Sequence, residues 1–115
     1  MFITNLDKVE KTVMTMEGAE KVWKQIPLSR ASGVPNFSFR VFTIEPGGHT
    51  PFHKHTAEHM NYIIEGRGVL VTKDRKHEVK KGDFALVLPG ELHQYKNTSS
   101  TQNLLMICAV PKEYE

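Results

Sequence analysis

Hydrophobic and polar residues alternate over short stretches along most of the chain, and turn-forming residues separate these stretches. The clearest predicted strand is Phe37–Ile44 (FSFRVFTI), because it is rich in aromatic and β-branched residues. The sequence EPGG that follows predicts the end of this strand. Further strands are predicted at His59–Ile64, Val69–Lys73, Lys76–Val79, Phe84–Leu88, Leu92–Lys96 and Asn103–Ala109.

The N-terminal part of the chain carries a weaker pattern. Residues 1–20 are polar and predict an extended N-terminal arm, with an edge strand near Val13–Met16. Lys21–Leu28 is compatible with a strand anchored by Trp23, which we expect to be a core or interface residue. Short strands between turn signals about every eight to twelve residues are typical of an all-β sandwich or barrel. We therefore predict a single all-β domain over residues 1–115.

The composition excludes several classes of protein. The 115 residues are 39% hydrophobic, and 15 Lys+Arg against 13 Asp+Glu give a net charge of +2, too small to indicate a nucleic-acid partner. A single cysteine, Cys108, excludes an internal disulfide. The chain start lacks the pattern of a secretory signal, and the longest apolar run, Leu104–Val110, is far shorter than the roughly 18 residues of a membrane helix. We expect a soluble, cytoplasmic protein with no membrane partner.

Four of the six histidines lie in the stretch between Gly47 and Gly66. His53, His55 and His59 have the spacing H-x-H-x-x-x-H. In an extended backbone the first two project to the same side, and the third can join them if the chain bends between Thr56 and Glu58. Because imidazole is a good ligand for Zn, Cu, Fe and Ni, this pattern predicts a site for a divalent transition metal.

Two groups of residues resemble the sequence motifs of the cupin superfamily. The residues with the spacing of the first motif are Gly47, His53, His55 and Gly66, with His59 where the motif has glutamate. The residues with the Gly-to-His interval of the second motif are Gly82, His93 and Asn97, whereas Pro89 and Gly90 are shifted. The resemblance is to small single-domain cupins and covers residues 37–112, the expected conserved barrel.

The resemblance implies a double-stranded β-helix, or jelly-roll barrel, with one metal near its wider mouth. The ligands it implies are His53, His55, His59 and His93. Glu58 lies one residue before the position of the family's acidic ligand, and on a strand it would face away from its neighbour His59. We interpret it as a nearby or surface acid. The family also implies a homodimer.

Four neutral imidazoles would leave the charge of a divalent metal uncompensated, so we expect a small and anionic molecule to bind beside it. Four protein ligands also leave open positions on an octahedral ion, which is room for a substrate. Zinc is expected last, because catalytic zinc usually keeps only three protein ligands. The predicted order is Mn or Fe(II), then Ni or Cu, then Zn.

The alternation of side chains along a strand predicts further residues of the pocket, because every second side chain points to the same face. The residues that share a face with a predicted ligand are Asn61, Ile63 and Tyr95. On the last strand Met106 and Cys108 point together, and they approach the site if their face lines the barrel. Cys108 is interpreted either as a small buried hydrophobe or as a functional thiol.

Arg40 interrupts an apolar strand, where a cation is unfavourable unless it finds a partner. Two interpretations remain open for this residue. It either anchors a substrate carboxylate inside the barrel, or lies on the outer face and pairs across an interface.

Three functions are compatible with these features. The first is a metal-dependent oxygenase, of dioxygenase type, acting on a small organic molecule inside the barrel. The second is an isomerase or decarboxylase that uses the metal as a Lewis acid, since cupins carry out all of these reactions. The third is a non-catalytic sensor barrel that binds a metal or a small molecule.

Overall fold

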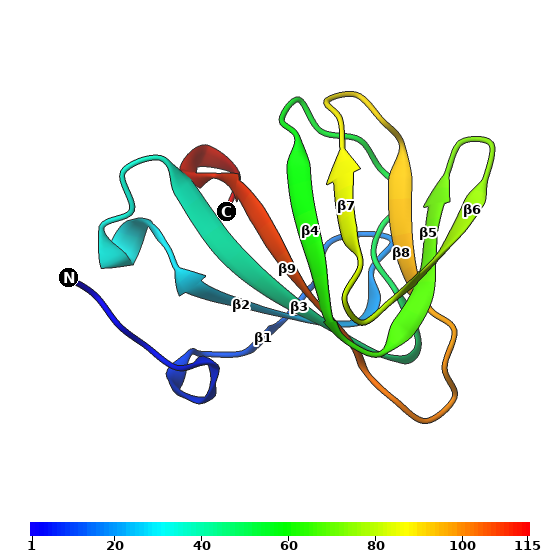
Figure 1. The fold of residues 1–115 in the computed structure, drawn as a ribbon, viewed down its shortest axis with the longest axis horizontal. Coiled ribbons are helices and arrows are strands. Elements are labelled where there is room, and N and C mark those ends of the chain that lie inside the picture. The colour runs from blue at the N-terminus through cyan, green and yellow to red at the C-terminus, as the bar shows by residue number, and fades with distance from the viewer.

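A computed structural model describes residues 1–115 and contains almost only strands and short turns (Figure 1). The strands are β1 (Thr12–Val13), β2 (Glu20–Leu28), β3 (Phe37–His49), β4 (His59–Glu65), β5 (Arg67–Thr72), β6 (Lys76–Lys80), β7 (Phe84–Val87), β8 (His93–Asn97) and β9 (Leu104–Pro111). The short 3-10 helices are η1 (Leu6–Lys8), η2 (Arg30–Ser32) and η3 (Lys112–Tyr114). The prediction of an all-β jelly-roll barrel is confirmed.

The strands form one curled antiparallel sheet. Its order is β6-β5-β8-β3-β9-β4-β7, and β2 adds to β3 as a branch that carries β1. The sheet folds back on itself, so that β4 and β7 face β8, β5 and β6 across the interior (Figure 1). The long strand β3 joins the two halves, because it pairs with β9 along most of its length and reaches β8 through His49.

The predicted end of β3 at EPGG is wrong, since the strand continues to His49. The pair Val22–Ile44 is followed by the pair Glu20–His49, so β3 inserts four residues opposite one residue of β2. This bulge uses glycine twice. Gly47 has φ +78, and a Cβ at the next glycine would lie 2.6 Å from the carbonyl oxygen of Glu20. The turn-forming residues therefore bend the strand and aim the following histidine segment at the barrel mouth.

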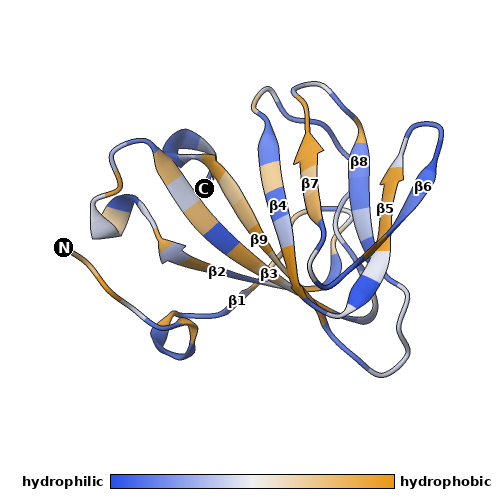
Figure 2. Cartoon of the chain, viewed as in Figure 1, coloured by the Kyte–Doolittle hydropathy of each residue, from blue (hydrophilic) through white to orange (hydrophobic).

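The core lies between the two halves of the sheet. Alternate residues of β9 are buried, and Leu104 and Val110 are completely inaccessible. Removal of such a side chain from water contributes about 1.5–3 kcal/mol. Figure 2 shows β7 and β9 as mainly hydrophobic, whereas β8 is mainly hydrophilic. In the first eight residues of β3, Arg40 is the one charged side chain.

The N-terminal arm packs along β2. Its strand β1 is shorter than predicted and lies slightly earlier, at Thr12–Val13. The Gln25 side chain fastens the arm, because its Nε2 donates to the carbonyls of Leu6 at 2.9 Å and Val9 at 3.0 Å. Trp23 is half-buried and donates from Nε1 to the Glu45 carboxylate at 3.0 Å. None of the helices has the length and apolar character needed to cross a bilayer.

Candidate metal centre

The four predicted ligands converge at one end of the barrel. His53 and His55 come from the segment between β3 and β4, where bends at residues 56 and 57 turn the chain toward His59 at the start of β4. His93 begins β8 and exchanges two backbone hydrogen bonds with His53, at 2.9 and 3.1 Å. One ligand atom from each of His53, His55 and His93 lies within 4.8 Å of the others.

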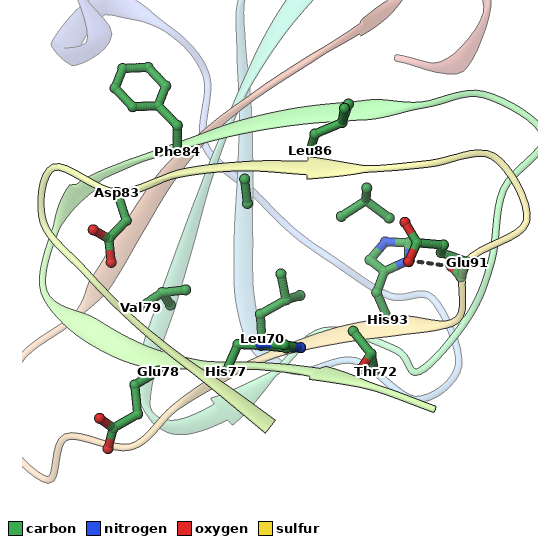
Figure 3. A pocket seen from close by; sticks show the side chains of 12 residues that line it. Leu70, Thr72, His77, Glu78, Val79, Asp83, Phe84, Leu86, Glu91 and His93 are labelled. Atoms are coloured by element: carbon green, nitrogen blue, oxygen red, sulfur yellow. Dashed lines mark hydrogen bonds between the residues drawn. The ribbon is translucent and has the colours of Figure 1, made fainter. Parts of the chain in front are cut away.

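Backbone carbonyls orient two of these rings. Nδ1 of His53 lies 2.7 Å from the Pro51 carbonyl, and Nδ1 of His93 lies 2.9 Å from the Glu91 carbonyl (Figure 3). A proton on Nδ1 satisfies each contact and leaves the lone pair of Nε2 free, which is the usual arrangement of a metal-binding histidine.

The third ring carries the clearest sign of a ligand. Nε2 of His55 is buried and has no hydrogen-bond partner within the protein. Such an orphaned polar atom is unfavourable unless something else satisfies it. A divalent metal at the meeting point of the three rings would do so, and the donor set therefore fits one.

His59 lies beside this cluster. Its ring stacks on His55 with centroids 4.1 Å apart and lies 5.6 Å from the ring of His93. It is only 7% exposed, although its nitrogens are not in the group of three that converge most closely. Glu58, in contrast, is exposed to solvent and does not line the cavity described below.

Burial keeps three of the four rings neutral. Desolvation, followed by the charges of neighbouring groups, lowers the pKa of His55 to about 4 and that of His59 to about 3. Desolvation also lowers the pKa of His93, against the opposing effect of its bond to the Glu91 carbonyl. Neutral imidazole is the form that binds metal, so no proton has to leave these three rings near neutral pH.

A cavity of about 250 Å³ extends from the four histidines into the barrel. The nominated pocket residues that line it are Arg40, Asn61, Tyr95, Met106 and Cys108. Ile63 points into the same interior but lies deeper, with 1% exposure, and forms part of the core instead of the cavity wall. Of the two interpretations of Arg40, the structure places its side chain inside the barrel.

The middle of the cavity wall is polar. Arg40, Cys108 and Asn61 pair across the neighbouring strands β3, β9 and β4, and the Arg40 Nη2 donates to the Cys108 Sγ at 2.9 Å. From the opposite half of the sheet, the Tyr95 hydroxyl donates to Asn61 Oδ1 at 2.9 Å. Burial raises the pKa of Tyr95, so this hydroxyl remains a neutral donor. A row of polar groups thus crosses an interior that is otherwise apolar.

Sequence reasoning missed part of the wall. Residues from the arm, from β2 and from the C-terminal turn also line the cavity, namely Met14, Met16, Lys24 and Tyr114. Parity within β2 would have placed Lys24 on a defined face, since it pairs with Phe42 of β3. The arm and the C-terminal turn give no comparable signal, because their approach depends on how the whole chain closes.

A second cavity of about 390 Å³ opens at the side of the barrel, between β5, β6 and β7 (Figure 3). Leu70 and Val79 point into it, and Glu78, Asp83 and Glu91 also line it. It contacts only His93 of the four histidines, so we place the functional site in the smaller cavity, which contacts all four.

The remaining two histidines lie outside the cluster. The Nδ1 of His49 lies 3.3 Å from the Thr50 carbonyl and 3.3 Å from the Gln94 amide. His77 is exposed on β6 and borders only the side cavity. Neither ring is therefore placed to join the other four.

Comparisons with known proteins agree with the observed fold. The sequence model of the cupin domain matches residues 40–110. An uncharacterized protein of Methanocaldococcus jannaschii is 29% identical over 94% of this chain and 85% of its own length. The polyketide cyclase RemF of Streptomyces resistomycificus superimposes with a TM-score of 0.91 at 26% identity, covering 97% of this chain and 80% of that one.

A predicted oxalate decarboxylase of Thermotoga maritima shares the fold, with a TM-score of 0.83 at 23% identity over 96% of this chain and 98% of that one. The family match covers more than half of the chain and includes the two strands that carry His59 and His93. This chain belongs to the cupin domain family.

Proposed function

We propose that this protein is a metal-dependent enzyme that acts on a small organic substrate inside the barrel. The observation that carries the proposal is the buried Nε2 of His55, which lacks a partner and lies where the oriented rings of His53 and His93 converge. His59 is proposed as the fourth ligand, since its ring lies directly against that of His55.

The reaction that this site supports best is a Lewis-acid conversion of an oxygenated substrate, such as a cyclisation, isomerisation or decarboxylation. A divalent metal held by neutral imidazoles would keep its full positive charge and polarise a substrate carbonyl or hydroxyl. The surrounding residues exclude water and position the substrate, with the Tyr95–Asn61 pair and Arg40 as polar contacts. The similarity to a protein described as a polyketide cyclase supports this class of chemistry.

An oxygenase reaction is the second candidate. It is favoured by the partly apolar cavity wall, which includes Phe42 and Met106, and by the affinity of imidazole for Fe(II) and related ions. Loss of an electron from the metal would be opposed by the neutral ligand set, because no carboxylate stabilises the higher charge. We therefore rank it second, with Mn or Fe(II) ahead of Ni, Cu and Zn as metals.

One experiment separates the candidates. The protein is loaded separately with Mn, Fe(II), Ni, Cu and Zn, and each form is incubated with β-diketones, β-keto acids and catechols while dioxygen uptake is recorded. Metal-dependent turnover of an enolisable carbonyl compound without dioxygen uptake is expected. Dioxygen consumption would identify an oxygenase instead. Bound metal without turnover across the panel would favour the sensor function. A Glu58→Ala variant is the control, since that side chain lies outside the cavity.

We further propose that the chain forms a homodimer through the outer face of the sheet. Two apolar rows lie on that face. Phe39, Ala109, Met60 and Leu86 cross β3, β9, β4 and β7, and Ile107, Tyr62 and Phe84 cross β9, β4 and β7. On β3 the second row meets Val41, which is already buried within the chain. Phe84 is 81% exposed. A second copy can cover these rows by a twofold arrangement without burying a charge.

Light scattering of the purified protein tests the dimer. A dimeric mass is expected, and Phe84→Asp should produce a monomer. His77→Asp, at another exposed position, should leave the dimer intact and serves as the control. A monomeric wild-type protein would contradict the proposal.

A further inference from the structure

We infer that the cavity contains a binding subsite for an organic anion, built by Arg40 and Lys24 on its β2–β3 side. This inference rests on the proposed function, because it assigns the substrate of the same cavity to the carboxylates or related oxyanions. It adds Lys24 to the residues that contact the substrate, and it specifies how the substrate is oriented in the cavity.

Arg40 is a buried cation without an anionic partner. Its side chain is 8% exposed. Nη2 donates to the thiol of Cys108 at 2.9 Å and Nη1 to the carbonyl of Tyr114 at 3.2 Å, while the buried Nε has no partner. A thiol is a weak acceptor, and a guanidinium has five N–H groups to satisfy. Removal of this charge from water is therefore poorly compensated within the protein.

Lys24 adds a second cation to the same cavity. It lies on β2, half-buried, and pairs in register with Phe42 of β3. Burial is the main cause that lowers its pKa, and the positive charge of Arg40 is the next. Two like charges in one cavity repel each other, and an anion between them would relieve that repulsion for both.

The one carboxylate that approaches this region is used elsewhere. Glu115 accepts from the backbone N–H of Arg30 and from the Ser38 hydroxyl, which are neutral donors. Its negative charge acts to raise the pKa of Lys24. The hydrogen bonds of the Arg40 guanidinium, however, go to other groups. Arg40 therefore retains capacity for an anion that comes from outside the chain.

The arrangement also indicates how the substrate lies. Arg40 is on β3 and His59 on β4, with β9 between them. Two strand spacings separate the two backbones by about 10 Å. Both side chains line the same cavity, so one small organic acid can reach both. The centroid of the Phe42 ring lies 5.0 Å from the guanidinium carbon, and Phe42 and Met106 both line the cavity. A molecule with a carboxylate at one end, an apolar middle and an oxygen donor at the histidine end fits this cavity.

Calorimetric titration with benzoate and with benzamide tests the subsite. The two probes have the same shape and differ in charge. Benzoate is expected to bind the full-length, metal-loaded protein at least about tenfold more tightly than benzamide. Arg40→Gln should weaken benzoate by about tenfold or more and leave benzamide unchanged. Lys24→Gln should weaken benzoate in the same direction by a smaller factor.

Three results would overturn the inference. These are equal affinities of the two probes, absence of benzoate binding, and unchanged benzoate affinity in a folded Arg40→Gln protein. If that variant does not fold, unchanged affinity in Lys24→Gln has the same meaning. Loss of benzoate binding in His55→Ala together with unchanged binding in Arg40→Gln would place the carboxylate at the metal. The metal content of every variant is measured separately, so a failure of the metal site is distinguished from a failure of the subsite.

Discussion

The two ends of the barrel cavity bury titratable groups in opposite ways. At the histidine end, burial lowers the pKa of His55 to about 4 and that of His59 to about 3, so the rings stay uncharged near neutral pH. At the other end, the Arg40 guanidinium is only 8% exposed and its hydrogen bonds go to neutral groups. The lone pairs of neutral imidazole nitrogens bind a metal cation, and the uncompensated guanidinium of Arg40 binds an anion. The contrast explains why one cavity accommodates both a metal and an anionic molecule.

The largest expected effect concerns the neutral end. A metal that binds only the folded state raises the free energy of unfolding by about 2.7 kcal/mol when the free metal concentration is 100 times the Kd. For a chain of this size that corresponds to a rise in Tm of about 10 °C. Thermal unfolding with and without added metal measures the shift. His55→Ala should show almost no shift, whereas an equal shift in that variant would place the metal elsewhere.

The charged end should respond differently to the loss of its central side chain. Arg40→Met replaces a buried cation that has no anionic partner with an apolar side chain of similar length, which removes the cost of keeping that charge away from water. We expect the free energy of unfolding to be unchanged or higher, while benzoate affinity falls. Urea denaturation measures the stability.

Met106→Ala is the matched control for that experiment, since it only creates a cavity in the same wall. It should lower the free energy of unfolding by about 2–5 kcal/mol. A comparable loss in Arg40→Met would mean that the arginine has a structural role.

The sequence predicts those residues of the cavity whose positions follow from local spacing or from alternation along a strand. The histidines are found because their spacing is local, and Asn61, Tyr95 and Cys108 follow from the alternation of side chains along strands. Parity gives the face of a residue but not its depth, which is why Ile63 belongs to the core.

Features that depend on chain closure could not be predicted in the same way. The contribution of Met14, Met16 and Tyr114 to the cavity requires the arm and the C-terminal turn to fold over the mouth of the barrel. The sequence EPGG predicts a strand end but forms a bulge, because turn residues occur in both, and only the pairing of β3 with β2 distinguishes the two. The sequence shows that Arg40 is unusual, but its partners become apparent only with β9 and the C-terminal turn beside it.

A smaller effect is expected in the pH dependence of the metal-free protein. In the unfolded chain a histidine has a pKa of about 6.5, so below that pH the unfolded state binds protons that folded His55 and His59 do not. The free energy of unfolding should therefore fall as the pH is lowered from about 6.5 toward about 4. Urea denaturation of chelated protein at several pH values measures this slope. His59→Gln should reduce it, and an unchanged slope in that variant would contradict the assignment.

The most direct test of the metal centre is the metal content of four proteins prepared in parallel. Elemental analysis after loading and desalting is applied to the wild type and to His55→Ala, His59→Ala and Glu58→Ala. We predict about one metal per chain in the wild type and in Glu58→Ala, and strongly reduced content in both histidine variants. Loss of metal in Glu58→Ala, with retention in the histidine variants, would contradict the assignment of an all-histidine site.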